Sequence, residues 1–560
     1  MDMRKHVLSL LAAAWLATHA FAAPIASDAE IKKILAERID ANQRGVGIVV
    51  GVIEPDGRRI IAYGNHDRTS KRTVNGDTVF EIGSITKVFT SLLLADAVQR
   101  GEVALSDPIS RYVPANVKLP ERSGKKITLQ DLAMHVSGLP GLPSNFSPKD
   151  DSNPYADYTV QQLYDFLGTY ELTRDIGESY EYSNLGAGLL GHILTLRTGK
   201  DYETLVRTRI TGPLAMKSTA IKLKPDMQKR LAKGHDPERA AVPNWDLPTL
   251  AGAGALRSTA NDLLNFLAAH LRQTQTPLAP AIASMLVPRR KTTRPEVDIA
   301  LGWHTMTTGD SEFLWHNGGT GGYRSFMGFD PKKRTGVVVL SNTMTREGVD
   351  DIGRHLLNES LPLWQPPKVA KEIAVDPAIL DRYVGIYDLA PEFALTITRE
   401  GNRLYSQATG QPRTELFAQS ETKFFLKVVD AQITFQPGPD GRATGLILHQ
   451  NGDHPAKRVE SHAAAPKQRT AIAVDPAILD RYVGRYQLMP GVTLTITREG
   501  DHLSVQVTGQ PKFEMAAESE RDFFVKEVDA QLTFVPDLAG RVTKLILHQG
   551  GIDRDAPRID

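Results

Sequence analysis

Cysteine is absent from this chain of 560 residues. Its absence excludes disulfide bonds, thiolate metal ligands, a cysteine nucleophile and lipid attachment through a thiol. A long apolar run is missing as well, because no segment approaches the roughly 18 consecutive apolar residues of a membrane-spanning helix. The sequence therefore predicts no membrane span, and covalent catalysis would need a nucleophile other than cysteine.

An excess of either charge is also lacking. Lysine and arginine together number 66 and aspartate and glutamate 65, which gives a formal net charge of +1. Such a balance supplies no electrostatic footprint for nucleic acid or anionic lipid. No set of histidines and acids has the spacing of a metal site. We expect a small-molecule or peptide substrate, no nucleic-acid partner and no metal.

Residues 1–22 have the pattern of a secretory signal peptide. Arg4 and Lys5 precede a mostly apolar stretch over residues 7–18, and Ala20-Phe21-Ala22 fits the small-residue cleavage pattern. Export of a chain without cysteine is compatible with a bacterial periplasm. The expected localisation is therefore the periplasm or the secreted fraction.

The chain is long enough for two or three domains. Strand-like runs at residues 46–53 and 59–63 begin one region, and similar runs at 325–329 and 337–340 end it, with helical patterns between them. This plan predicts an α/β (α+β) domain over residues 23–363. A proline-rich segment then interrupts the pattern and indicates a linker.

The remainder of the chain is a duplication. Residues 373–385 recur as residues 472–484, and the register does not slip further along. Within each copy, apolar residues alternate with polar ones and glycine-containing turns follow, which is typical of antiparallel strands with one buried face. We predict two all-β barrel domains at residues 369–460 and 469–560, joined by residues 461–468.

Ser84 and Lys87 form an S-x-x-K motif. If a helix begins near Ser84, side chains three residues apart share one face, so the amine lies beside the hydroxyl. Ser84 would then occupy the first turn, where backbone N–H groups favour an anionic oxygen. An N-cap serine followed by a surface lysine would give the same four letters, and the motif alone does not distinguish the two.

Tyr182-Ser183-Asn184 follows far along the chain. Tyr182 can take or relay the proton of a nucleophile, because a neighbouring cation lowers the pKa of a phenol. Asn184 can orient Lys87 and bind a substrate carbonyl if the segment turns. A plain helix start would also explain these residues.

His316-Asn317-Gly318-Gly319 is the third segment. Its glycines let a backbone strand approach a ligand closely, so the N–H of Gly319 could face that of Ser84 across an oxyanion. The alternative is a glycine-rich hairpin connection with a solvated histidine. His135 and Trp303-His304 are interpreted as packing residues.

These three segments, in this order, resemble the motifs of penicillin-binding proteins and serine β-lactamases. Residues 23–363 are most similar to the class C β-lactamase and D,D-peptidase branch, which uses a tyrosine motif. The resemblance extends to Phe80-Glu81-Ile82-Gly83, residues 101–108, residues 127–132, residues 135–140 and Leu301-Gly302-Trp303.

The resemblance implies a fold and a set of roles. The fold is an antiparallel sheet flanked by helices, beside a helical lobe, with the cleft between them. Ser84 is then the nucleophile, Lys87 and Tyr182 form the coupled base, Asn184 binds substrate, and the N–H groups of Ser84 and Gly319 form the oxyanion hole. No metal or organic cofactor is implied.

The third motif departs from the family's β-lactamases. They usually carry lysine where this chain has His316, and a hydroxyl residue where it has Asn317; Gly318 completes the substrate-binding segment. A histidine with a pKa of about 6.5 is mostly neutral above pH 7, so a carboxylate would lose affinity as pH rises through that value. The H-x-G variant resembles D-aminopeptidases, esterases and related peptidoglycan hydrolases.

The sequence thus predicts an exported serine hydrolase that forms an acyl-enzyme on Ser84 and cleaves peptide, amide or ester bonds in D-amino-acid or peptidoglycan-derived substrates. A class C-like β-lactamase is the alternative, because it forms the same first intermediate. A second alternative is a penicillin-binding receptor without turnover. The duplicated region resembles lipocalin-like domains of related hydrolases, in which a barrel loop can restrict the cleft; stabilising packing or cell-wall adhesion would explain it equally.

Overall fold

The computed structural model describes residues 25–560, apart from residues 310, 367–371, 391–392, 410, 412, 428–430, 451, 460–470, 490–491, 508–511, 526–529, 538–539 and 550–551. The predicted signal peptide and the predicted connection at residues 461–468 lie outside the described residues. The chain divides into two compact units, Met1–Trp364 and Gln365–Asp560. Within the described part, no helix combines the length and apolar character needed to cross a bilayer.

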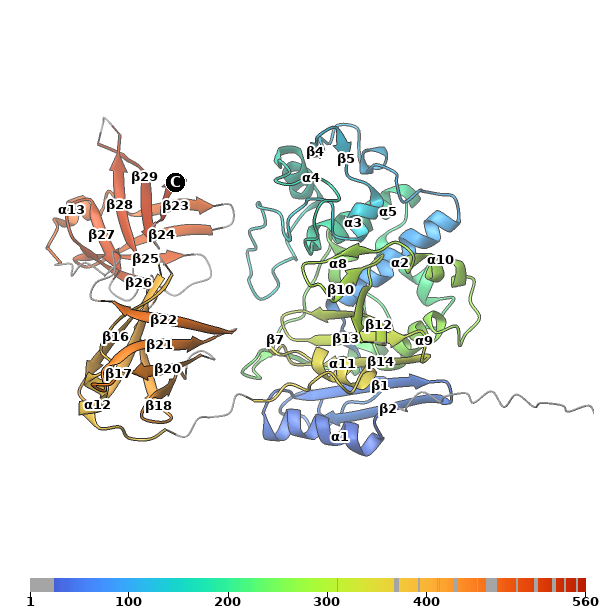
Figure 1. Cartoon of the computed structure of the whole chain (residues 1–560). Coiled ribbons are helices and arrows are strands. Elements are labelled where there is room, and N and C mark those ends of the chain that lie inside the picture. Colours follow the sequence, from blue (N-terminus) through green and yellow to red (C-terminus); the bar gives the residue numbers. More distant parts are fainter. Residues whose placement is uncertain are drawn as a thin grey trace, which may run out of the picture. The chain divides into compact units, whose positions relative to one another are not determined.

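The first unit is built on a sheet of eight strands (Figure 1). These are β1 (Gly47–Glu54), β2 (Gly57–Gly64), β9 (Arg290–Lys291), β10 (Val297–Ile299), β11 (His304–Thr308), β12 (Ser311–Gly319), β13 (Arg324–Asp330) and β14 (Thr335–Ser341). Their order is β2-β1-β14-β13-β12-β11-β10-β9, and all neighbours pair antiparallel. The four strand runs expected from the sequence correspond to β1, β2, β13 and β14.

Both faces of this sheet are covered. Ile48 and Val50 of β1 pack in one core with α1 (Asp28–Ala36) and α11 (Asp350–Leu357). Val49 belongs to the other core, together with α2 (Thr86–Gln99) and α9 (Ala260–His270). Because successive side chains of a strand point to opposite faces, a strand covered on both sides is apolar throughout. This explains the uninterrupted apolar run of β1.

Helix α2 lies between the sheet and a lobe of helices α3, α4 and α5 (Figure 1). The other α-helices of this unit are α3 (Leu129–Ala133), α4 (Val160–Thr169), α5 (Asn184–Thr198), α6 (Tyr202–Val206), α7 (Pro225–Arg230), α8 (Ala251–Gly254) and α10 (Ala279–Met285). Short π-helical segments are η1 (Glu37–Ala41) and η4 (Arg207–Thr211), and short 3-10 helices are η2 (Gly83–Ile85) and η3 (Ile109–Arg111). Two-stranded sheets pair β3 (Phe80–Glu81) with β8 (Arg257–Ser258), β4 (Glu121–Arg122) with β5 (Lys125–Lys126) and β6 (Gly234–His235) with β7 (Ala241–Val242). The predicted arrangement of sheet and helical lobe is confirmed.

The second unit contains the duplicated sequence as two antiparallel eight-stranded sheets. The first is a closed barrel of β15 (Gly385–Ala390), β16 (Phe393–Glu400), β17 (Arg403–Ala408), β18 (Thr414–Ala418), β19 (Lys423–Phe425), β20 (Gln432–Pro437), β21 (Ala443–His449) and β22 (Asp453–Val459), preceded by α12 (Pro377–Asp381). The second has the same order in β23 (Gly484–Met489), β24 (Val492–Glu499), β25 (His502–Val507), β26 (Lys512–Ala517), β27 (Asp522–Val525), β28 (Gln531–Pro536), β29 (Val542–Gln549) and β30 (Ile552–Pro557), preceded by α13 (Pro476–Leu479).

The same aromatic core fills both barrels. The rings of Tyr383 and Phe435 stack at 4.2 Å in the first copy, and those of Tyr482 and Phe534 stack at 4.2 Å in the second. Stacked aromatic pairs add packing energy beyond the area that they bury. The prediction of two all-β antiparallel barrels is confirmed.

Candidate active site

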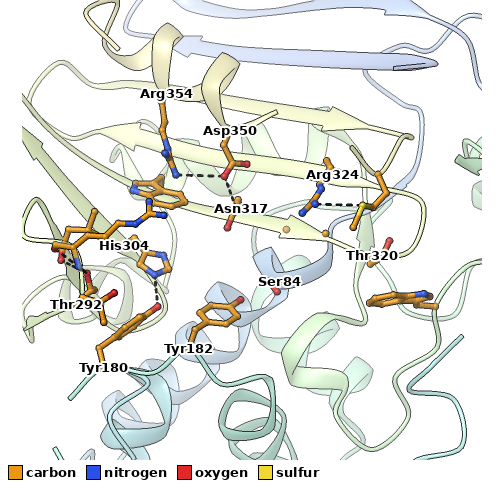
Figure 2. Close-up of a pocket in the computed structure, with 18 residues that line it drawn as sticks. Ser84, Tyr180, Tyr182, Thr292, His304, Asn317, Thr320, Arg324, Asp350 and Arg354 are labelled. Carbon is orange, nitrogen blue, oxygen red and sulfur yellow. Dashed lines mark hydrogen bonds and ion pairs between the residues drawn. The ribbon is translucent and has the colours of Figure 1, made fainter. Parts of the chain in front are cut away.

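The three sequence segments meet at one pocket of about 520 Å³ (Figure 2). Ser84 comes from η2, directly before α2, and lines the pocket together with Tyr182. Asn317, Gly318 and Gly319 of β12 line the opposite side. The sheet and the helical lobe therefore contribute to the same site, as the sequence predicted.

Lys87 lies in the first turn of α2 and is only 2% exposed. Its Nζ is 2.9 Å from Ser84 Oγ, 2.8 Å from Asn184 Oδ1 and 2.8 Å from the carbonyl oxygen of Ala253. Burial holds the pKa of this amine well below its ordinary value. The neutral amine is thus the form that the surroundings favour.

These neighbours also orient the amine. A neutral amine has two N–H groups and one lone pair, whereas the oxygens of Asn184 and Ala253 can only accept hydrogen bonds. In the neutral form both N–H groups are used there and the lone pair is left for the hydroxyl of Ser84, whereas an ammonium donates to all three oxygens. Lys87 is placed to receive the Ser84 proton.

Tyr182 stands on the other side of the nucleophile. Its hydroxyl shares a hydrogen bond with Ser84, and its ring centre is 4.7 Å from Lys87 Nζ. Burial raises the pKa of Tyr182 and outweighs the opposing effect of that hydrogen bond. The expectation that a neighbouring cation lowers this pKa was wrong, because the burial of the phenol dominates. Tyr182 is a neutral phenol that can donate and relay a proton.

Asn184 is the first residue of α5, whose N-cap is Ser183. The Ser183 hydroxyl accepts the N–H of Gly186 at 2.8 Å, so the segment is a capped helix start as well as a site motif. Asn184 Oδ1 accepts from Lys87 and its Nδ2 donates to the hydroxyl of Tyr155 at 3.1 Å. Since both ends of the amide are used, Asn184 orients Lys87 and does not line the pocket.

The backbone of β12 lies directly against the segment that carries Ser84. A Cβ on Gly318 would stand 2.1 Å from the carbonyl oxygen of Ile82, and one on Gly83 would stand 2.7 Å from the nitrogen of Gly319. Contacts this short exclude side chains, so glycine is needed at Gly318 and Gly83. Ser325 fixes the approach by donating to the Ile82 carbonyl at 2.8 Å. The backbone of Gly319 is thereby held against Gly83, the residue before Ser84.

His316 does not have the surroundings that were expected. It is wholly buried, and its Nδ1–H donates to the carbonyl oxygen of Asn317 at 2.6 Å. Burial holds the pKa of His316 well below its ordinary value. A neutral ring outside the pocket lining cannot bind a substrate carboxylate through a positive charge. The expected loss of carboxylate affinity around a pKa of 6.5 therefore has no basis in this site.

Two further histidines pack around Tyr182. His135 accepts the N–H of Ser183 at 3.1 Å, and its ring centre is 4.7 Å from that of Tyr182. His304 stacks on Trp315 at 4.9 Å, and its Nε2 is 2.9 Å from the hydroxyl of Tyr180. His304 is thus a packing residue, as interpreted, but it also lines the pocket. Burial lowers the pKa of His304 to about 4.

Sequence reasoning missed several polar groups of the pocket. Asn317 donates to Asp350, which also lies 3.6 Å from Arg354, and the Arg354 guanidinium stands 4.1 Å above the Trp315 ring (Figure 2). Arg324 comes from β13, beside Gly319. No spacing rule pointed to these side chains, because each reaches the pocket only through strand pairing or helix packing.

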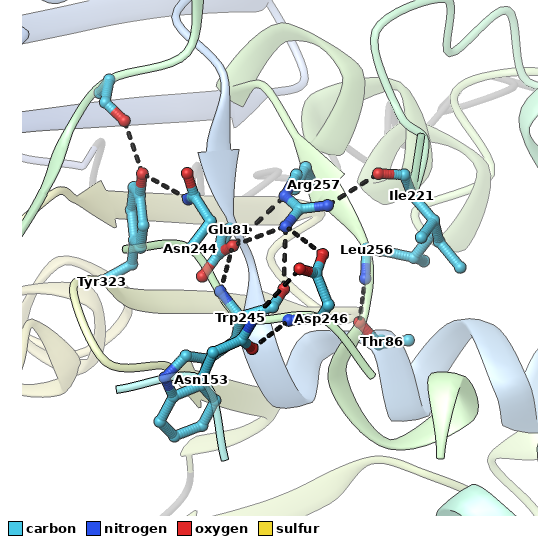
Figure 3. A network of polar contacts seen from close by, with 11 residues as sticks. Glu81, Thr86, Asn153, Ile221, Asn244, Trp245, Asp246, Leu256, Arg257 and Tyr323 are labelled. Carbon is cyan, nitrogen blue, oxygen red and sulfur yellow. Dashed lines mark hydrogen bonds and ion pairs between the residues drawn. The ribbon is translucent and has the colours of Figure 1, made fainter. Parts of the chain in front are cut away.

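One wall of the pocket rests on a buried ion pair (Figure 3). Glu81 and Arg257 are 3.0 Å apart and almost fully buried. Glu81 accepts the backbone N–H of Trp245 at 3.1 Å, and Arg257 donates to the backbone oxygen of Trp245 at 2.8 Å. The pair therefore holds the pocket residue Trp245 from both sides.

The described residues contain no cluster of three histidines, cysteines or acids that could hold a metal ion. The fold and the site together define a serine hydrolase in which a buried amine stands beside the nucleophile. The chain belongs to the beta-lactamase family: the family model named Beta-lactamase matches residues 31–360. A model described as a domain of unknown function (DUF3471) matches residues 369–460 and 468–556.

Several known proteins are similar to this chain. Penicillin-binding protein 4* of Bacillus subtilis is 28% identical over 414 residues, covering 70% of this chain and 90% of the relative. The D-alanyl-D-alanine-carboxypeptidase/endopeptidase AmpH of Escherichia coli is 29% identical over 338 residues, covering 57% of this chain and 86% of the relative. A solved beta-lactamase/D-alanine carboxypeptidase from Yersinia pestis, complexed with citrate, is 26% identical with a TM-score of 0.50, covering 57% of this chain and 94% of that one.

Proposed function

We propose that the protein is an exported hydrolase that forms an acyl-enzyme on Ser84 and cleaves peptide, amide or ester bonds. The observation that carries the proposal is the buried amine of Lys87, whose Nζ lies 2.9 Å from Ser84 Oγ. A serine hydroxyl is a weak nucleophile until a neighbouring base takes its proton. Lys87 is that base, because its neutral amine can accept the Ser84 proton.

The reaction follows from these positions. Lys87 Nζ takes the Ser84 proton while Oγ bonds to the substrate carbonyl carbon, and the N–H groups of Ser84 and Gly319 stabilise the oxyanion. When the intermediate collapses, the bond to the leaving group breaks, and the proton passes from Lys87 through the Tyr182 hydroxyl to that group. Water then attacks the carbonyl carbon of the ester and gives its proton to the same base. The bond to Ser84 Oγ breaks, the proton returns to that oxygen, and the acid is released.

The proposed substrates are D-amino-acid or peptidoglycan-derived compounds. The relatives named as D-alanyl-D-alanine-carboxypeptidase/endopeptidase and penicillin-binding protein support this class. Hydrolysis of the β-lactam ring is the second candidate, because it needs the same first intermediate and because a class C beta-lactamase from Rhodobacter sphaeroides is 26% identical with a TM-score of 0.50, covering 60% of this chain and 97% of that one. The two activities differ in which acyl group fits and how fast water removes it.

Mass spectrometry after a short β-lactam pulse tests the acyl-enzyme. We expect an adduct on the wild-type protein and none on Ser84→Ala. An adduct that persists would favour a receptor without turnover, whereas an adduct that decays within seconds to minutes favours an enzyme. An adduct of equal yield on Ser84→Ala would contradict the proposed nucleophile.

A substrate panel separates the two enzyme activities. Nitrocefin, D-alanyl p-nitroanilide and short-chain p-nitrophenyl esters should be compared for the same preparation. We expect turnover of the anilide or the esters. Fast nitrocefin hydrolysis without activity on the other compounds would instead assign the chain to β-lactam hydrolysis.

Export and domain organisation belong to the same proposal. Removal of residues 1–22 would leave a catalytic domain at residues 23–363 and two barrels at residues 369–460 and 469–560. Expression in a Gram-negative host and N-terminal sequencing of the periplasmic fraction should give a chain that begins at Ala23. An unprocessed chain that stays with the cytoplasm would contradict export.

A further inference from the structure

Both residues beside Tyr182 in the chain are bound to one distant residue, His135. The N–H of Glu181 donates to the carbonyl oxygen of His135 at 2.9 Å. The N–H of Ser183 donates to the ring nitrogen His135 Nδ1 at 3.1 Å. The backbone on either side of the phenol is therefore tied to His135, once through its main chain and once through its side chain.

His135 has an unusual backbone conformation at this point. Its φ is +58°, in the left-handed region that residues other than glycine rarely adopt and in which asparagine, aspartate and histidine are enriched. The residue is only 2% exposed, and its ring centre is 4.7 Å from that of Tyr182. In this conformation, the carbonyl oxygen and the ring of a single residue both reach the segment that carries the tyrosine.

The contact with Ser183 requires a neutral ring. A backbone N–H only donates, so Nδ1 must keep its lone pair, and a protonated ring would place an N–H against the N–H of Ser183. Burial holds the pKa of His135 well below its ordinary value, so the acceptor is preserved. His135 lies outside the pocket lining, so its effect on a reaction has to pass through the residues that it holds.

We infer that His135 is a positioning residue: by binding the backbone of Glu181 and Ser183, it keeps the Tyr182 hydroxyl in place against Ser84. The inference rests on the proposed function, since it concerns the proton relay through Tyr182. That hydroxyl shares a hydrogen bond with Ser84. A displacement of about 1 Å in a reacting group can lower a rate about 100-fold, so a relay of this kind depends on a fixed backbone.

A set of variants separates positioning from packing. His135→Asn carries an oxygen on Cγ, where Nδ1 is attached in histidine, and asparagine also adopts a positive φ, so both contacts can be kept. His135→Leu has nearly the shape of asparagine but no acceptor. Tyr182→Phe removes the relay, alone or together with His135→Leu. The control His270→Leu replaces a buried histidine of α9 that hydrogen-bonds to Phe266 and lies outside the pocket lining.

The assay measures kcat and KM for phenyl acetate, whose leaving group needs a proton more than p-nitrophenol does. His135→Leu should lower kcat about 10- to 100-fold and change KM less than about threefold. His135→Asn should stay within about fivefold of the wild type. In the Tyr182→Phe background, His135→Leu should lower kcat by less than about a further threefold, because no hydroxyl is left to position. His270→Leu should lower stability and keep kcat close to that of the wild type.

Hydrogen exchange of residues 178–185 gives a readout that does not depend on turnover. The N–H groups of Glu181 and Ser183 lie in this segment, and loss of the Nδ1 acceptor frees that of Ser183. We expect faster exchange in His135→Leu than in the wild type, and exchange close to that of the wild type in His135→Asn.

Three results would overturn the inference. One is a wild-type kcat in a folded His135→Leu protein. Another is a loss in His135→Asn as large as that in His135→Leu. The third is an equal loss with and without the Tyr182 hydroxyl, which would indicate a general structural role. If His135→Leu does not fold, His135→Gly takes its place in the same comparison, because glycine adopts a positive φ freely and lacks the acceptor. Failure of the proposed function is distinct, because Ser84→Ala would then still hydrolyse phenyl acetate.

Discussion

Replacing Asn184 by aspartate tests the protonation state on which the mechanism depends. In the wild type the Asn184 oxygen accepts one N–H of Lys87 at 2.8 Å and carries no charge. Asn184→Asp places a carboxylate at the same distance with little change in shape. The ammonium form of Lys87 is then strongly favoured, and an ammonium has no lone pair with which to take the Ser84 proton.

The size of the effect follows from Coulomb's law. For two unit charges separated by the 2.8 Å of this contact, an effective dielectric constant of about 20 gives an attraction of about 6 kcal/mol. Such an energy corresponds to about four pKa units if all of it acts on the lysine. Even half of it would lower the fraction of neutral amine about 100-fold wherever the wild-type amine is half neutral or less.

The assay is the pH dependence of kcat/KM for a neutral p-nitrophenyl ester. The burial of Lys87 lowers its pKa, so we expect the wild-type rate to reach its plateau at a lower pH than a free lysine would allow. Asn184→Asp should move the rising limb of the pH–kcat/KM profile to higher pH and lower kcat/KM at least about 100-fold at neutral pH, with partial recovery of the rate at alkaline pH. The control Asn184→Ala removes the hydrogen bond without adding charge and should leave the limb near its original position.

The opposite result would refute the reasoning. If the pH–kcat/KM profile of Asn184→Asp rises at the same pH as that of the wild type, or if the variant is faster at neutral pH, then Lys87 is charged in the active enzyme. The base would then have to be the Tyr182 phenolate. Thermal unfolding of both variants checks that the comparison is made between folded proteins.

Three further predictions concern the surroundings of the nucleophile. Tyr182→Phe removes the proton relay but keeps the packing, so kcat should fall by about 10²- to 10⁴-fold with little change in urea stability; a loss below tenfold would exclude the relay. Glu81→Gln leaves the buried Arg257 guanidinium with the exposed Asp246, at 3.4 Å, as its remaining carboxylate partner, so the variant should lower the free energy of unfolding in urea by about 3 kcal/mol and raise KM. The control Asp246→Asn should lower the free energy of unfolding by less than about 1 kcal/mol. Equal losses in the two variants would contradict the role of the Glu81–Arg257 pair. Burial lowers the pKa of His304 from 6.5 to about 4, so the unfolded chain binds a proton at a higher pH than the folded one. The free energy of unfolding should therefore fall by up to about 3 kcal/mol as the pH drops from about 6.5 to about 4. Denaturant midpoints that do not change across this range would contradict the prediction.

Much of the architecture could be predicted because it depends on local patterns. Hairpin strands, the duplicated barrels and the three-residue spacing of Ser84 and Lys87 all lie within short stretches of sequence. The spacing places the two side chains on one helical face, and the structure has them 2.9 Å apart. A prediction of this kind needs no knowledge of distant contacts.

Other features of the site depend on partners far away in the chain. Arg324 reaches the pocket because β13 pairs with β12, and Trp245 is held by an ion pair between Glu81 and Arg257. The direction of the Tyr182 pKa shift was missed for the same reason: it depends on burial, which the neighbouring residues in sequence do not determine. Sequence motifs identify reactive residue types, but their charge states come from the tertiary packing.

One physical condition links the catalytic and the binding parts of this pocket. Burial favours the neutral amine of Lys87, the neutral phenol of Tyr182 and the neutral ring of His316, which suits proton transfer but removes the cations that could attract a substrate. A guanidinium is the side chain whose charge survives such an environment. The charges that remain in the pocket lining are those of Arg294, Arg324, Arg354 and Asp350, so electrostatic attraction of a substrate depends on these side chains and not on the residues that transfer the proton.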